Sequence, residues 1–107
     1  MIRIGPASIP YVIDILKNGD EESRKTAMLV LEGLRKKAAP AVPDLIRCLL
    51  EDKSAAVRQA SATCLGFVGA DAEAAVPALE QAVTNDVPEV ANTAKYALER
   101  IRRSSSK

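Results

Sequence analysis

Apolar residues recur along this chain at spacings that fit one face of an α-helix and do not fit a β-strand. In three segments they follow one another at steps of three, three and one residues, which places them on one side of a helix. The three sets are Ile9, Val12, Ile15, Leu16; Val42, Leu45, Cys48, Leu49; and Val76, Leu79, Ala82, Val83. We call the predicted helices that carry these sets the A helices.

A second, mostly apolar set follows each A helix, at steps of four, three, one and three residues in every case. These sets are Ser23, Ala27, Val30, Leu31, Leu34; Val57, Ser61, Cys64, Leu65, Val68; and Val90, Ala94, Ala97, Leu98, Ile101. They predict three further helices, which we call the B helices. The two patterns together predict an all-α chain of three helical hairpins over about residues 6–36, 39–69 and 73–103, with residues 104–107 as a disordered tail.

Prolines and short polar residues predict where several helices begin and end. A proline lies near the predicted start of each A helix, where a missing N–H costs little; these are Pro10, Pro43 and Pro77. Gly19 predicts a left-handed end for the first A helix, ahead of Asp20 as the cap of the next helix. Asp86 and Glu89 have capping-box spacing before the last B helix.

The second hairpin carries the fullest motif: Ala41-Val42-Pro43-Asp44-Leu45, Asp52, Val57-Arg58, Ala60 and Leu65-Gly66-Phe67-Val68-Gly69. With these residues the chain resembles the HEAT-like repeat family, in the branch found in phycobilisome-lyase-type and other bacterial repeat proteins. The resemblance covers essentially the whole chain up to about Arg102. It implies a right-handed α-solenoid with the B helices on its concave side, and a protein-binding scaffold rather than an enzyme.

The resemblance also implies that a loop aspartate and a B-helix arginine link neighbouring repeats. The positions that match are Asp52, Asp86, Arg24 and Arg58, whereas Gly19 and Ala91 depart from the pattern. One aspartate and one arginine are therefore missing, and the implied ladder is incomplete.

The composition argues against catalysis and against metal or cofactor binding. The chain has no histidine, which removes histidine-dependent nucleophile pairs and metal ligands. Cys48 and Cys64 occupy predicted core positions, where cysteine behaves as a small hydrophobic residue. We therefore expect no enzyme activity and no cofactor. The beginning of the sequence lacks a signal-peptide pattern, and the longest unbroken apolar run, residues 27–31, is too short to span a bilayer. These features predict a cytoplasmic protein without membrane contact.

Charged residues gather at opposite ends of the predicted B helices, as the helix macrodipole favours. The acidic set is Asp20, Glu21, Glu22, Glu51, Asp52, Asp86 and Glu89, with Lys53 as the only nearby base. The basic set is Arg35, Lys36, Lys37, Arg100, Arg102 and Arg103, and it is partly offset by Asp71 and Glu73. Weak nucleic-acid binding through these basic ends stays open. It is disfavoured because the net charge is only +1 and because only three aromatic residues, Tyr11, Phe67 and Tyr96, are present for base stacking.

Rows of B-helix positions that point away from the predicted core form the candidate partner-binding surface. The candidate residues are Lys25, Met28, Leu29, Gln59, Thr63, Asn92, Lys95 and Tyr96. Tyr and Met are enriched at the cores of protein interfaces, which favours this interpretation. The alternative is that Leu29 and Tyr96 only extend the flank of the core.

We therefore expect a protein-interaction or scaffolding module that belongs to a larger repeat protein or assembly. The resemblance alone implies a second possibility, an accessory subunit of lyase type that acts on a chromophore or cofactor enzyme. Residues 3–6, Arg-Ile-Gly-Pro, resemble the close of a preceding B helix. No polar cap precedes the first hairpin, so we expect its apolar side to face a preceding repeat or a second copy of the chain.

Overall fold

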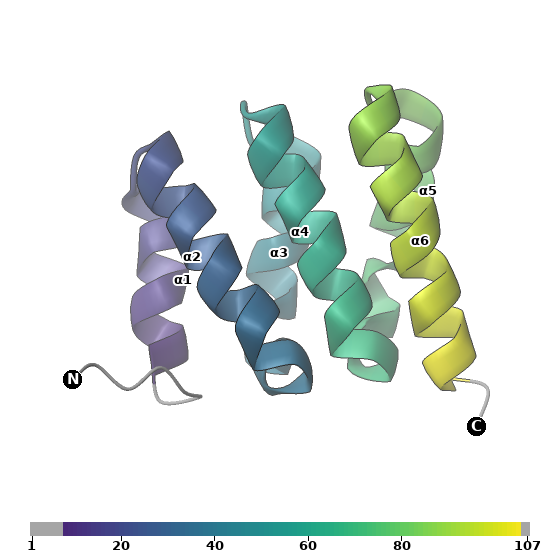
Figure 1. Ribbon diagram of the computed structural model, residues 1–107, viewed down its shortest axis with the longest axis horizontal. Helices are drawn as coiled ribbons and strands as arrows, with labels where there is room; N and C mark the ends of the chain where they lie inside the picture. The colour runs from purple at the N-terminus through teal and green to yellow at the C-terminus, as the bar shows by residue number, and fades with distance from the viewer. Residues whose placement is uncertain (1–7, 106–107) are drawn as a thin grey trace.

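The computed structural model describes residues 8–105, which form three helical hairpins side by side (Figure 1). The A helices are α1 (Ile9–Asn18), α3 (Val42–Glu51) and α5 (Val76–Asn85), and the B helices are α2 (Glu21–Leu34), α4 (Ala55–Val68) and α6 (Pro88–Ser105). Two 3-10 segments connect the hairpins, η2 (Arg35–Ala41) and η3 (Gly69–Ala75). Figure 1 shows the B helices in one layer and the A helices in a second layer behind them. The prediction of an all-α repeat fold is confirmed.

The predicted apolar stripes meet between the two layers and form the core. Every stripe residue of the middle hairpin is buried, because a neighbouring hairpin covers it on each side. In the first hairpin, Val30 and Leu34 are only partly buried, whereas their counterparts Cys64 and Val68 are each 1% exposed. The first hairpin therefore leaves apolar surface on its outer side, as expected. Ser23 was wrongly placed in the core: it lies in the first turn of α2 and is exposed.

The helix ends agree with the sequence at some positions and correct it at others. Each A helix has its proline at the second residue, and Asp20 caps α2 by accepting a hydrogen bond from the Ser23 N–H at 2.9 Å. The left-handed end predicted at Gly19 is wrong, because this residue is extended, with φ −78° and ψ 162°. No capping box forms at Asp86, whose carboxylate accepts instead from the adjacent Val87 N–H at 2.7 Å.

The predicted tail is helical through its first two residues, since α6 continues to Ser105. Ser104 packs close to Gly69, and the Ser105 hydroxyl lies 3.4 Å from a carboxylate oxygen of Glu73. These contacts with the preceding linker hold the last turn of the helix against the stack. Residues 106–107, and residues 3–6 with their resemblance to a helix end, lie outside the described residues.

One stretch of residues 8–105 is long and apolar enough, by length and composition alone, to cross a membrane. It runs from Ala55 to Asn85 and comprises α4, η3 and α5, which Figure 1 shows as separate parts of two hairpins. Its most apolar window is 56% buried inside the protein, as in the core helix of a soluble protein. This stretch is therefore weak evidence for a membrane span, and the absence of membrane contact stays a prediction.

Candidate protein-binding surface

Two arginine–aspartate pairs join the three hairpins near the turns between A and B helices. Arg24 of the first hairpin donates from Nε and Nη2 to the two carboxylate oxygens of Asp52, at 2.8 and 2.9 Å. Arg58 of the second hairpin contacts Asp86 of the third in the same way, at 3.0 Å for both hydrogen bonds. Such two-point contacts fix direction as well as distance. The ladder is therefore continuous between the described hairpins. The two positions that lack the expected residue, Gly19 in place of an aspartate and Ala91 in place of an arginine, lie in the first and third hairpins.

The two pairs are partly buried, and each arginine also holds the backbone of its own turn. Arg24 Nη1 donates to the Gly19 carbonyl at 3.0 Å, and Arg58 Nη1 donates to the Asp52 carbonyl at 2.9 Å. The hydrogen bond from Arg58 lowers the pKa of Asp86 below its ordinary value. The negative charge of the turns between A and B helices is thus neutralised to a greater extent than expected, because Arg24 and Arg58 lie among the acidic residues in addition to Lys53. The ladder sets the relative positions of the B helices and of the face they share.

Three of the predicted partner-binding residues form a row across this face. Leu29, Thr63 and Tyr96 stand at equivalent positions of α2, α4 and α6. Leu29 is 67% exposed and Tyr96 is 69% exposed, whereas Thr63 between them is half-buried. This exposure argues against the alternative that Leu29 and Tyr96 only extend the core. A second predicted row, Lys25, Gln59 and Asn92, lies one helical turn away on the same three helices.

The remaining two predicted residues do not belong to this face. Met28 is fully buried: the hydroxyl of Ser61 lies 3.8 Å from its sulfur, and the Cys64 thiol lies 3.4 Å from its carbonyl oxygen. On α2, Met28 occupies the side that faces the second hairpin, and α4 therefore covers it. Lys95, the same position on α6, is exposed because no described hairpin follows, and it lies in a depression with Glu80 and Arg102 at that end of the stack.

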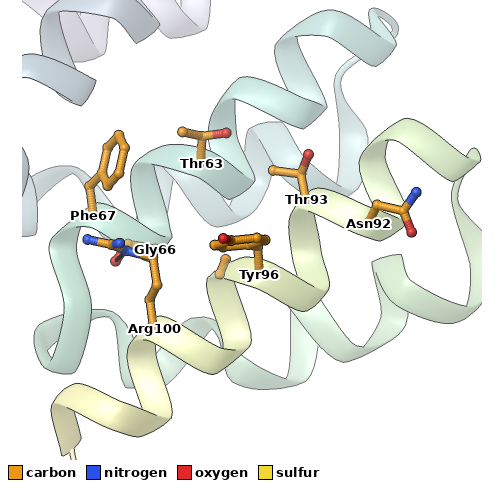
Figure 2. A pocket seen from close by; sticks show the side chains of 8 residues that line it. Thr63, Gly66, Phe67, Asn92, Thr93, Tyr96 and Arg100 are labelled. Carbon is orange, nitrogen blue, oxygen red and sulfur yellow. Dashed lines mark hydrogen bonds between the residues drawn. The ribbon is translucent and has the colours of Figure 1, made fainter.

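A groove of about 320 Å³ lies between α4 and α6 on the B-helix face (Figure 2). Its lining residues are Thr63, Gly66, Phe67, Asn92, Thr93, Tyr96, Ala97 and Arg100. Three of these were predicted from the sequence, namely Thr63, Asn92 and Tyr96. Sequence reasoning missed Phe67, Thr93 and Arg100. The signal was available, because Phe67 and Arg100 follow Thr63 and Tyr96 by four residues and so occupy the next turn of the same face.

Gly66 allows α4 and α6 to approach each other at the floor of the groove. A Cβ atom at this position would lie 3.1 Å from the Cα and 3.2 Å from the Cβ of Ala97, a tighter contact than most Cβ atoms make, so the two helices would have to move slightly apart. The glycine lies inside α4, two residues before the last residue of the helix. The small residues Gly66 and Ala97 thus form a low floor, and the larger side chains of Phe67, Tyr96 and Arg100 rise beside it (Figure 2).

A protein-family model described as HEAT repeats matches residues 9–99. The chain belongs to the HEAT-repeat family. No curated protein sequence matches it significantly. HEAT repeats are commonly protein-interaction or scaffold modules, and this general role agrees with the exposed row and the groove on the B helices.

In this HEAT-repeat chain a cation–aromatic stack connects all three repeats beside the groove. The ring of Phe67 in the second repeat has the guanidinium carbon of Arg35 from the first repeat 3.9 Å from its centroid. The guanidinium carbon of Arg100 from the third repeat lies 5.0 Å from the same centroid. Both distances are within the range of a cation–π interaction. Figure 2 shows Phe67, Arg100 and Tyr96 around one end of the groove.

The two thiols of the HEAT-repeat chain are placed as packing groups. Cys48 and Cys64 are both free and buried. Burial raises the pKa of Cys48, and it raises the pKa of Cys64 to about 12. Because the thiolate is the reactive and metal-binding form, burial suppresses the chemistry of both residues. Within residues 8–105, no group of three or more His, Cys, Asp or Glu side chains is arranged to hold a metal ion.

Proposed function

We propose that this HEAT-repeat chain is a non-catalytic module that binds another protein on the face formed by α2, α4 and α6. The observation that carries the proposal is the row in which Leu29 and Tyr96, 67% and 69% exposed, stand on either side of Thr63. Large apolar side chains this exposed cost free energy in water, and a protein partner would recover it by covering them.

The surroundings of the row resemble the composition of a protein interface. The groove next to Tyr96 combines aromatic carbon with the amide of Asn92 and the guanidinium of Arg100. Tyr and Arg are the residue types most enriched at energetically important interface positions. The polar groups of Thr63, Gln59 and Thr93 already hydrogen-bond within the repeats, which makes this part of the face rigid before a partner binds.

Site-specific photo-crosslinking in cells that produce the protein tests this function. A photoreactive phenylalanine derivative replaces Leu29 or Tyr96 on the B-helix face, and Tyr11 serves as the matched control. Tyr11 is 71% exposed but belongs to α1 in the other layer. We expect discrete protein adducts, identified by mass spectrometry, from positions 29 and 96 and not from position 11.

Other outcomes of the same experiment would reject the proposal. Adducts only from position 11 would move the interface to the A helices. Adducts removed by nuclease would favour nucleic-acid binding. A visible absorption band that copurifies with the chain and is lost on Tyr96→Ala would favour the accessory role toward a chromophore.

A further inference from the structure

We infer that the B-helix face recognises an acidic segment of its partner, with carboxylates that contact Arg35 and Arg100 beside Phe67. The inference rests on the proposed function, because it names the chemistry of the partner bound at that same face. Arg35, Phe67 and Arg100 lie on three successive repeats, so a segment that crosses the repeats meets both guanidinium groups.

The two arginines at Phe67 lack the carboxylate partners that the other inter-repeat arginines have. Arg24 and Arg58 each hold an aspartate, whereas no carboxylate of the described residues lies within 4.0 Å of Arg35 or Arg100. Toward the described residues, Arg100 donates a single long hydrogen bond of 3.4 Å, from Nε to the Gly66 carbonyl. A guanidinium that stacks on a ring keeps its in-plane N–H donors free, and these donors match the two oxygens of a carboxylate.

The backbone at Arg35 supplies an independent reason to assign a binding role. Arg35 follows α2 with φ 54° and ψ −124°, and Gly69 has nearly the same values, 79° and −136°, at the equivalent position after α4. Glycine takes this conformation readily, whereas a side chain makes it strained. Within residues 8–105, Arg35 is the only non-glycine residue with positive φ. The first repeat therefore holds an arginine in a conformation that suits glycine, with its guanidinium directed over Phe67.

Local charge favours an acidic partner over a neutral one. Lys36 and Lys37 follow Arg35, and Arg103 follows Arg100 by one helical turn, so further basic residues adjoin the stack in sequence, and they are only partly offset by Asp71, which lies in a depression with Lys36. The nearest acidic residue on that turn of α6, Glu99, already faces Arg103 at 3.7 Å. The guanidinium groups of Arg35 and Arg100 both lie at the ring of Phe67, and a carboxylate bound there would be attracted by both positive charges.

The partner segment is a polypeptide rather than a nucleic acid because the cations form one cluster at one end of the groove. Nucleic-acid binding draws on many phosphate contacts along a basic stripe, and the net charge of this chain is only +1. The rest of the face offers Leu29, Thr63 and Asn92, which suit the mixed side chains of a peptide. We therefore expect a segment in which acidic residues alternate with apolar ones, the latter placed on Leu29 and Tyr96.

Selection from a random peptide library displayed on phage, with the full chain as bait, tests the inference. We expect enriched peptides that carry Asp or Glu near an apolar residue. A synthetic copy of the best peptide should bind about tenfold more weakly to Arg100→Gln, a loss typical of one charged contact, and equally well to the control Arg102→Gln. Arg102 lies on the same helix but pairs with Glu80, in the depression that also contains Lys95 and not in the groove beside Phe67.

Arg35→Gly separates binding from stability. Glycine relieves the backbone strain, so the melting temperature should stay the same or rise while the acidic peptide binds more weakly. A fall in melting temperature with unchanged peptide binding would show that Arg35 only stabilises the stack, and it would overturn the inference.

Three further results overturn the inference and separate it from the proposed function. Neutral or basic peptides that bind Arg100→Gln as tightly as the original chain would refute acidic recognition and leave protein binding intact. Oligothymidine binding that Arg100→Gln abolishes, without binding of acidic peptides, would make the site a nucleic-acid site. If neither Tyr96→Ala nor Arg100→Gln weakens the binding of the enriched peptides, the peptides do not bind at this face. The proposed function would then be rejected together with the inference.

Discussion

The guanidinium of Arg58 and the carboxylate of Asp86 meet at two points, each with 3.0 Å between nitrogen and oxygen, and thereby join the second repeat to the third. Their side chains are only 19% and 13% exposed. Shielding of this kind strengthens the pair relative to surface ion pairs, and removal of one partner leaves the other poorly solvated. The stability of the repeat interface should therefore depend on both residues together.

A double-mutant cycle measures this dependence. We expect Arg58→Ala and Asp86→Ala each to lower the free energy of unfolding by about 1–2 kcal/mol, and the double variant to lose less than the sum by about 1 kcal/mol. Urea unfolding followed by circular dichroism gives all three values. The exposed pair Arg102 and Glu80 is the control, with an expected coupling below about 0.5 kcal/mol. Equal coupling in both cycles would contradict a special role for the ladder.

Acid should weaken the same link. The pKa of Asp86 is lowered in the folded chain from its ordinary value of 3.8, chiefly by the hydrogen bond from Arg58. The unfolded state therefore binds the proton more readily, so this contribution to stability is present above the ordinary pKa and is lost as the pH falls through the folded value. The difference in unfolding free energy between the original chain and Asp86→Asn should shrink between about pH 5 and about pH 2. A constant difference over that range would show that the charge of Asp86 contributes nothing.

Hydropathy periodicity was sufficient to predict the hairpins, because helix burial depends on spacing that is visible in one sequence. Nearly every stripe residue is at least partly buried, and the prolines stand at the helix starts as expected. The Arg–Asp positions followed from the family resemblance. The sequence of each repeat alone does not show that Arg24 contacts the aspartate of the next repeat, Asp52. The glycine at position 19, where the pattern has an aspartate, therefore wrongly suggested that the ladder is broken.

The candidate binding face was predicted less completely, because the pattern of one helix does not show which of its residues the neighbouring repeats cover. Met28 lies off the core stripe of its own hairpin, yet the next hairpin covers it. Phe67 and its two arginines come from three different repeats, and their contact depends on how closely the repeats approach. Gly66 sets part of that approach through its contact with Ala97. Distances between repeats are not encoded in the periodicity of any one helix.

The core of the middle repeat gives a direct test of the register. Leu65 is fully buried, and an aspartate there would carry an unpaired charge into the core, at a cost comparable with the whole stability of a small domain. We expect Leu65→Asp to unfold the protein. Gln59→Asp is the control on the same helix: it loses the 3.1 Å hydrogen bond to Thr93, worth about 1 kcal/mol, and stays folded. Similar melting temperatures for the two variants would mean that the register is wrong.

The two cysteines should be chemically silent in the folded chain. Burial raises the pKa of both thiols, that of Cys64 to about 12, and keeps reagents away from both sulfur atoms. At about pH 8 we expect neither thiol to react with an aromatic disulfide reagent before unfolding, and both to react in concentrated urea. Rapid reaction of one equivalent in the absence of denaturant would show a local opening that exposes the core.

Met28 and Tyr96, which the sequence placed together on the binding face, should now behave in opposite ways. Met28 is fully buried between α2 and α4, so Met28→Ala should lower the free energy of unfolding by about 2–4 kcal/mol through lost contacts and a cavity. Tyr96 is 69% exposed, so Tyr96→Ala should change stability by less than about 0.5 kcal/mol and instead weaken binding of the partner or of a selected peptide. Thermal unfolding and a binding titration of both variants decide the matter. If Tyr96→Ala costs several kcal/mol, the ring belongs to the core and the proposed face loses its central residue.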